Sequence, residues 1–172
     1  MRLYQCFLVS VAALAVAACG TTLDATRMPE LQAARKAQRP IFVGNLFAGK
    51  ADKRGFIDAG AHIFNTSGKT YKYVDLHLTA TNRVGDPIVR NGEQSPMVRL
   101  RFTGPLPPRR ASGRTTWPNV WYLQKPACLT VLKIDITRMD GSTVSLDGAA
   151  LDDVLSKKLR QDCRVKLTAL RR

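Results

Sequence analysis

Acidic residues and histidines are scarce in this sequence. Its 172 residues include 27 Lys and Arg but only 13 Asp and Glu, and the glutamates are limited to Glu30 and Glu93. The two histidines, His62 and His77, restrict the metal sites and acid–base pairs that the chain can build. Motifs of serine hydrolases, P-loop proteins and zinc proteases are also absent. We therefore expect a protein that is not an enzyme.

Long apolar runs are absent except at the N-terminus. A basic head that ends at Arg2 precedes an almost unbroken apolar stretch over residues 3–16, and Ala17 and Ala18 follow it. A basic head, an apolar core and small residues at the cut are typical of a secretory signal peptide. The run is a little short for a membrane span of about 20 residues. We expect residues 1–18 to be removed on export.

The segment Val16-Ala17-Ala18-Cys19 resembles the lipobox of bacterial lipoproteins, and this resemblance covers the first 20 residues. It implies that Cys19 becomes the first mature residue and carries a diacylglycerol thioether and an N-acyl chain; we expect no other cofactor. Two or three acyl chains make a stable anchor, whereas one binds marginally. Gly20 in place of Asp implies sorting to the periplasmic face of the outer membrane. The alternatives are an ordinary secretory signal with an incidental cysteine, or an uncleaved anchor.

The mature chain is strongly basic. Removal of Arg2 with the signal leaves 26 basic and 13 acidic residues, a net charge of +13. Such a charge favours anionic lipid, acidic glycan, lipopolysaccharide phosphate or an acidic envelope protein as a partner. Because the chain is exported, we do not expect nucleic acid as a partner. The alternative is that the arginine content reflects genome composition, since the charges are spread along the chain.

Two cysteines remain after the signal and the lipidation site are set aside. Cys128 and Cys163 would lie in an oxidising compartment, where two such residues most simply pair with each other. A bridge between them would stabilise the fold by about 3–4 kcal/mol. A redox pair or a metal site is the alternative, but the spacing is far from that of a redox motif and histidines are few. We expect a structural disulfide.

The mature chain is long enough for one domain and has three expected parts. Residues 19–28 form a lipidated tether, residues 29–61 a short helix over 29–38 and a packing segment, and residues 62–172 the main domain. Apolar and polar residues alternate in the main domain, as in half-buried antiparallel strands. For example, Leu132, Ile134 and Ile136 are expected to share a face. The expected strands are 62–64, 70–82, 98–102, 117–123, 127–139 and 143–146.

The C-terminal part changes to a helical period. Leu151, Val154, Leu155 and Leu159 have the spacing of one helix face, with acidic residues early and basic residues late. Strands with turn signals between them and flanking helices predict a mainly β protein, a single antiparallel β-sandwich with a short N-terminal helix and a C-terminal helix.

Turn and core residues over most of 62–143 resemble small immunoglobulin-like β-sandwich domains of uncharacterised bacterial surface proteins. The resemblance lies in segments 63–76, 81–87, 102–106 and 139–142, together with Trp121, Tyr122 and Cys128. It implies an immunoglobulin-like sandwich and concerns fold more than function. The basic loop 109–114 and the C-terminal helix depart from the pattern, so either could be the specialised part.

Few residues suggest chemistry. His77 lies two residues from Asp75 on the polar side of an expected strand, so the carboxylate could orient the imidazole. No serine or cysteine nucleophile lies in a recognisable motif, and the simpler alternative is a pair of solvated polar residues. Asp135, Asp140 and Asp147 could coordinate a hard cation, but their spacing matches no loop motif. We expect no metal site.

The basic loop is the candidate contact surface. Arg109, Arg110 and Arg114 would form it together with Trp117 and Trp121, since arginine and aromatic residues anchor many interfaces. The alternative places both tryptophans in the core. We expect a lipid-anchored binding or structural protein of the cell envelope. The alternatives are a binder of envelope polyanions, namely lipopolysaccharide or acidic glycan, and an accessory lipoprotein of a secretion apparatus, which rests on size and location alone.

Overall fold

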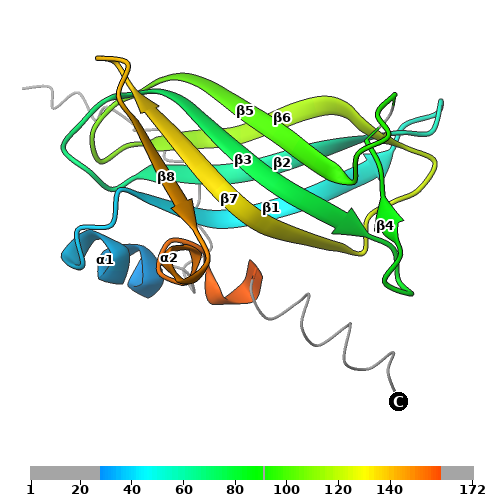
Figure 1. Ribbon diagram of the computed structural model, residues 1–172, viewed down its shortest axis with the longest axis horizontal. Helices are drawn as coiled ribbons and strands as arrows, with labels where there is room; N and C mark the ends of the chain where they lie inside the picture. Colours follow the sequence, from blue (N-terminus) through cyan, green and yellow to red (C-terminus); the bar gives the residue numbers. More distant parts are fainter. Residues whose placement is uncertain (1–27, 91, 160–172) are drawn as a thin grey trace, which may run out of the picture.

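A computed structural model describes residues 28–90 and 92–159, and two antiparallel sheets packed face to face make up most of it (Figure 1). The predicted mainly β sandwich is confirmed. The strands are β1 (Ile41–Ala51), β2 (Phe56–Asn65), β3 (Tyr71–Thr81), β4 (Pro87–Ile88), β5 (Met97–Leu106), β6 (Ala111–Tyr122), β7 (Cys128–Arg138) and β8 (Thr143–Asp147). The helices are α1 (Met28–Lys36) and α2 (Ala149–Asp152).

The strand pairing within the two sheets resembles that of an immunoglobulin-like sandwich. One sheet has the order β1-β2-β6. In the other sheet, β7 lies between β3 and β8, and β5 and the short β4 both pair with the opposite edge of β3. In chain order, the grouping of the first, second and sixth strands against the third, seventh and eighth resembles that of the immunoglobulin fold. Here β5 pairs with β3 of the second sheet.

The core lies between the two sheets. Val74, Leu76 and Leu78 of β3 point inward and have no exposed surface, as the alternation over 70–82 predicted. Ile57 and Ile63 of β2 meet them from the other sheet in the same cluster of buried residues. Burial of each such side chain stabilises the fold by about 1.5–3 kcal/mol. Strong packing from both sheets makes the domain a rigid support for its surface residues.

The segment before His62 differs from the prediction, because it forms β1 and most of β2. The sandwich therefore begins at Ile41. Irregularities in the pairing between Val43 and Asn45 and between Ala48 and Ala51 interrupt the period-2 pattern of β1. In addition, the outer face of this sheet is apolar where α1 covers it, in a cluster of Leu31, Ala34, Phe42 and Phe64. A strand that is apolar on both faces lacks the alternation that identifies it in the sequence.

The C-terminal segment is not the continuous helix that was predicted. α2 ends at Asp152, and the chain then lies along the free edge of β1. There the Val43 amide donates to the Val154 carbonyl (2.8 Å), and the Ser156 amide donates to the Val43 carbonyl (3.0 Å). Leu155 forms a parallel bridge with Val43, and Leu151, Val154 and Leu155 are buried. The apolar spacing therefore serves an edge-covering segment. Within residues 28–90 and 92–159, no helix is long and apolar enough to span a membrane.

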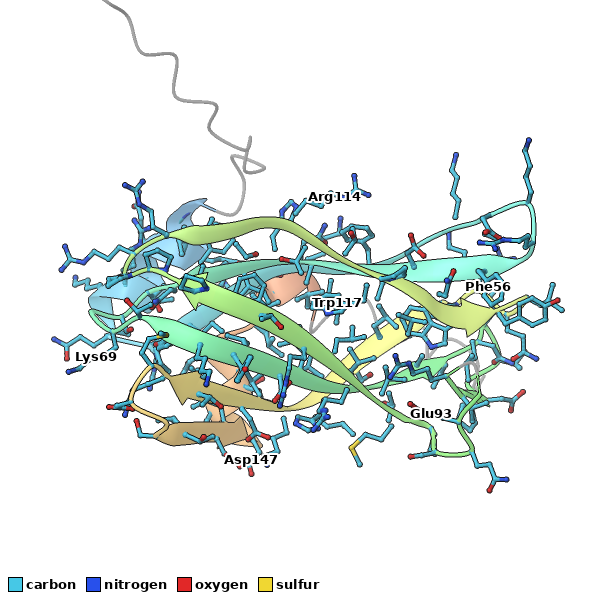
Figure 2. The ribbon with its side chains drawn as sticks, turned by 90° about the horizontal axis from the view of Figure 1, so that it is seen from above. Phe56, Lys69, Glu93, Arg114, Trp117 and Asp147 are labelled. Carbon is cyan, nitrogen blue, oxygen red and sulfur yellow. The ribbon has the colours of Figure 1, made fainter. Side chains whose placement is uncertain are left out.

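The strands run lengthwise between two ends that differ in composition. The β1–β2 turn and residues 123–127 lie at one end, while loops 66–70, 107–110 and 139–142 lie at the other. Figure 2 shows Phe56 at the first end and Lys69 at the second. The pairing of β2 with β6 connects the ends, from Phe56 opposite Tyr122 to Phe64 opposite Ala111.

Candidate functional site

Basic side chains gather at the end that carries the β5–β6 loop. Arg109 and Arg110 are exposed in this loop, and the Arg35 guanidinium of α1 donates to the Arg109 carbonyl (3.5 Å). Lys69 and Arg138 lie in the same region, close to Asp140. The pKa of the Asp140 carboxyl is lowered chiefly by hydrogen bonds from Ser142 and further by the charges of Arg138 and Lys69. We define the cationic end as Arg35, Lys69, Arg109, Arg110 and Arg138.

One buried amide organises the cationic end. Asn65 has no exposed surface, and its side-chain NH₂ donates to the carbonyls of Lys69, Leu106 and Pro107 at 2.7, 3.0 and 3.0 Å. Its side-chain oxygen accepts the Ser67 amide at 3.0 Å. Because these groups belong to two different loops, Asn65 ties the loop of Lys69 to the loop of Arg109. The basic side chains therefore project from a hydrogen-bonded base.

The five residues of the predicted contact surface do not form one surface. Arg114 lies on the outer face of β6 and stacks over the Phe47 ring at 5.0 Å. Trp117 is partly buried, and its indole N–H donates to the Arg101 carbonyl of β5 (2.6 Å), which joins the edges of the two sheets. Trp121 has no exposed surface.

The assignment of Trp121 to a contact surface was wrong. It pairs with the fully buried Ile57 and points into the core, while Trp117 pairs with the buried Ala59 on the same inner side. The alternative that placed the tryptophans in the core holds for Trp121 and in part for Trp117. Only Arg109 and Arg110, of the residues predicted, belong to the cationic end.

The outer face of the second sheet carries a network of charged side chains. Asp75, which is 5 % exposed, accepts two hydrogen bonds from Arg101 at 2.8 and 2.7 Å. His77 contacts Asp135 on β7 (2.9 Å), while Asp75 binds Arg101, so the possible pairing of His77 with Asp75 along one strand gives way to contacts across strands. The reason is register: His77 lies opposite Lys133, which makes Asp135 its diagonal neighbour across the strands.

Asp135 is the centre of this network. The Ser145 hydroxyl donates to one of its oxygens at 2.6 Å, and the Lys133 ammonium lies 3.0 Å from the same oxygen. Partial burial alone would raise the pKa of Asp135, but the hydrogen bonds from Ser145, Lys133 and His77 outweigh it and lower the pKa. Asp135 is therefore a carboxylate at neutral pH.

The network lacks the arrangement of a nucleophile and its base. In a catalytic triad the serine hydroxyl faces the histidine and the carboxylate lies behind it. Here the Ser145 hydroxyl and His77 both contact the carboxylate of Asp135. Within the described ranges, no three His, Cys, Asp or Glu side chains are placed to hold a metal ion. Cross-strand stabilisation of the sheet accounts for these contacts.

A shallow cleft of about 480 Å³ lies beside β5. His77, Arg99 and Arg101 line it from the second sheet, and Trp117 lines it from β6. Arg90 and Glu93, which form an ion pair at 3.1 Å, also line it. The cleft therefore presents arginine beside an aromatic ring.

The predicted modification sites are only partly described. Cys128 begins β7 and is 7 % exposed, which suits a structural cysteine. Cys163 and Cys19 lie outside the described residues. The disulfide and the lipidation stay predictions.

Comparison with known proteins provides no functional assignment. No protein family, no curated protein and no solved structure matches this chain. Function has to be inferred from the geometry of the described residues.

Proposed function

We propose that this chain is a lipid-anchored component of the bacterial cell envelope that acts through contacts and not through catalysis. The cationic end is the observation that carries the proposal. Its side chains come from α1, two separate loops and the last residue of β7, and Asn65 holds the two loops together. A charged surface built on a buried framework is suited to recognise a partner of opposite charge.

The charges of the cationic end are available to a partner. None of the salt bridges found between described residues includes Arg35, Lys69, Arg109, Arg110 or Arg138. Arg109 has a positive φ of 57°, so it lies at a sharply turned loop position. Exposed charges of one sign speed association with an oppositely charged surface and select against partners of the same sign. We infer that the partner is an envelope protein with an acidic surface.

The N-terminal segment sets how far the domain can lie from its anchor. Met28 is nine positions after Cys19, so a fully extended chain would reach about 30 Å. This distance is close to the length of a ten-residue strand such as β2, about 33 Å. Either end of the sandwich could therefore lie next to the membrane while the other faces a partner.

Crosslinking in living cells followed by mass spectrometry tests this function. The double variant Arg109→Glu/Arg110→Glu should reduce recovery of the protein partner about tenfold, as expected from loss of about 1.4 kcal/mol of binding free energy. The control Arg83→Glu/Lys158→Glu makes the same change in charge at exposed residues elsewhere and should leave recovery unchanged. A Cys19→Ser variant should lose both membrane attachment and the partner.

Two results would contradict the proposal. Equal recovery of the partner from both double variants would exclude the cationic end as the contact surface. An N-terminal peptide of the mature protein without acyl chains would exclude the anchor.

A second candidate is binding of envelope polyanions, and the cleft beside β5 favours it. Arg99 lines this cleft and forms no salt bridge with another described residue. Binding of lipopolysaccharide through this site should weaken steeply with salt and should be lost in Arg99→Glu. The Arg109→Glu/Arg110→Glu variant would retain it, which separates the two candidates.

A further inference from the structure

The end of the sandwich opposite the cationic end exposes apolar side chains. Leu123 is 68 % exposed and Tyr122 is 46 % exposed, both where β6 leaves the sheet. The Tyr122 ring packs against Phe56 of β2, with 5.1 Å between ring centroids. We define the apolar tip as Phe56, Tyr122 and Leu123. Figure 2 shows Phe56 at the extreme of this end.

The apolar tip is held firmly in place. Asp52 closes the β1–β2 turn, since its carboxylate accepts the amides of Arg54 and Phe56 at 2.9 and 2.8 Å. The Leu123 amide donates to the Gly55 carbonyl at 2.8 Å, which joins this turn to the end of β6. The exposure of Leu123 is therefore set by an ordered hydrogen-bonded turn.

Leu123 has an unfavourable backbone conformation. Its φ is +58°, in the left-handed region that bulky residues rarely adopt. Gly55 beside it also has a positive φ, of 90°, and a side chain at that position would collide with the Leu123 methyl group. A large apolar residue that is both strained and exposed points to a role at a contact, because solvent exposure alone would favour a glycine or an asparagine here.

Basic side chains surround the apolar tip. Lys53, Arg54 and Lys125 are exposed in the two adjoining turns, and the Arg54 guanidinium lies 5.3 Å from the centre of the Phe56 ring. Asp52 closes its turn and also pairs with the Arg54 guanidinium (3.2 Å), whereas Lys53 and Lys125 form no salt bridge with another described residue. Apolar and aromatic side chains flanked by Lys and Arg match the boundary between acyl chains and anionic head groups, where the cations reach the phosphates.

We propose that the apolar tip binds the surface of a phospholipid bilayer, with Leu123 and the Phe56–Tyr122 pair at the level of the glycerol groups. The nearness of the bilayer rests on the proposed lipid anchor at Cys19. The contact itself rests on exposure, strain and charge at the tip. With the tip on the membrane, the cationic end points away from it, toward the partner.

Lipid photocrosslinking of the full chain tests this contact. The purified protein is bound to vesicles of phosphatidylethanolamine and phosphatidylglycerol that contain a phospholipid with a diazirine close to its glycerol. After irradiation, we expect lipid adducts on the tryptic peptides 55–69 and 115–133, which hold the apolar tip; Pro126 blocks cleavage after Lys125. The peptide that holds Met139 is the internal reference, because this residue is 59 % exposed at the opposite end.

Two substitutions of Leu123 sharpen the test. Leu123→Asp should reduce tip adducts about tenfold, because the variant loses the favourable free energy of transferring a leucine side chain from water into the bilayer. Leu123→Gly should reduce them similarly and also relieves the backbone strain, so it keeps the test valid if the aspartate variant does not fold. Met139→Asp is the matched control and should leave tip adducts unchanged.

Adducts concentrated on the Met139 peptide, or undiminished adducts in both Leu123 variants, would overturn the proposal. The same spectra report the lipid state of Cys19 independently. Tip adducts on a chain that lacks acyl groups would refute the proposed anchor and would support the tip as a membrane contact in its own right.

Discussion

The two ends of this sandwich belong to the same strands but are built by different interactions. At the cationic end, buried polar groups hold the loops: Asn65 binds three carbonyls, and the Tyr71 hydroxyl donates to the Pro40 carbonyl at 2.7 Å. At the apolar tip, Asp52 closes the β1–β2 turn with exposed hydrogen bonds, and the Phe56–Tyr122 pair and the neighbouring buried Trp121 supply apolar packing. Loops that are held by buried polar side chains leave their charged residues free for contacts. A tip that is supported by aromatic packing keeps apolar residues at its surface.

The middle of the molecule keeps the two ends in a fixed relation. The Arg101 guanidinium donates to Asp75, and the Arg101 carbonyl accepts a hydrogen bond from the Trp117 indole. One residue of β5 therefore links the charged face to the opposite sheet. Only Asp75 of this pair is buried, so removing Arg101 would leave a buried carboxylate without its partner and destabilise the fold. A fixed relation matters if one end lies on a membrane and the other on a partner.

The largest effect is expected from Trp121→Ala at the base of the apolar tip. Loss of this fully buried side chain should lower the free energy of unfolding by about 3–5 kcal/mol, measured by urea denaturation. Hydrogen exchange should show lost protection first at residues 55–57 and 120–123, because these amides lie around the cavity. Equal loss of protection at loop 107–110 would show that the two ends are not held independently.

A smaller effect is expected from Asn65→Ala at the cationic end. Three carbonyls would lose their donor, and the free energy of unfolding should fall by about 2–3 kcal/mol. Protection from hydrogen exchange should fall in loops 66–70 and 107–110 and persist at Phe56. The matched control is Asn82→Ala, since Asn82 accepts the amides of Val84 and Asp86 in an exposed turn. Water can replace it there, so the free energy of unfolding should fall by only about 1 kcal/mol.

Alternation predicted those strands in which one face is buried and the other carries polar residues. β3 follows it from Val74 to Ala80, and the expected strands 127–139 and 143–146 pair as a hairpin whose turn has a positive φ of 87° at Gly141. Ile134 and Ile136 of β7 are buried as expected, but Leu132 is 43 % exposed. A register shift between His77 and Leu78 of the paired strand displaces it. Such a shift depends on the neighbouring strand and leaves no mark in the local pattern.

The sites depend on pairings that are distant in sequence. His77 meets Asp135 across 58 positions, and the Asn65 side chain joins loops some 40 positions apart. The exposure of Arg109 and Arg110 could be predicted from the sequence, because a loop rich in Pro and Arg is expected to lie at the surface. The apolar tip could not, because Leu123 lies in an apolar segment and its exposure comes from the left-handed turn that ends β6.

The smallest effect is expected from acid, and it acts at the β1–β2 turn. The pKa of Asp52 is lowered from its usual 3.8, chiefly by the hydrogen bond from the Phe56 amide, with further contributions from the amide and side chain of Arg54. A lowered pKa in the folded state means that the carboxylate stabilises the turn above pH 4 or so, and that this contribution is lost as the pH falls through the lowered value. We expect the NMR signals of the Phe56 and Arg54 amides to shift as the pH falls below 3.8 and the turn loosens.

Asp52→Asn separates this titration from the rest of the molecule. The amide oxygen of asparagine can still accept both backbone hydrogen bonds but does not titrate in this range, so the acid shift at Phe56 should disappear. Asp140→Asn is the matched change at the cationic end, where Ser142 lowers the pKa of the carboxyl in the same way, and it should leave the Phe56 titration intact. If Phe56 responded to Asp140→Asn as strongly as to Asp52→Asn, protonation would act on the whole sandwich, and the independence of the two ends would be wrong.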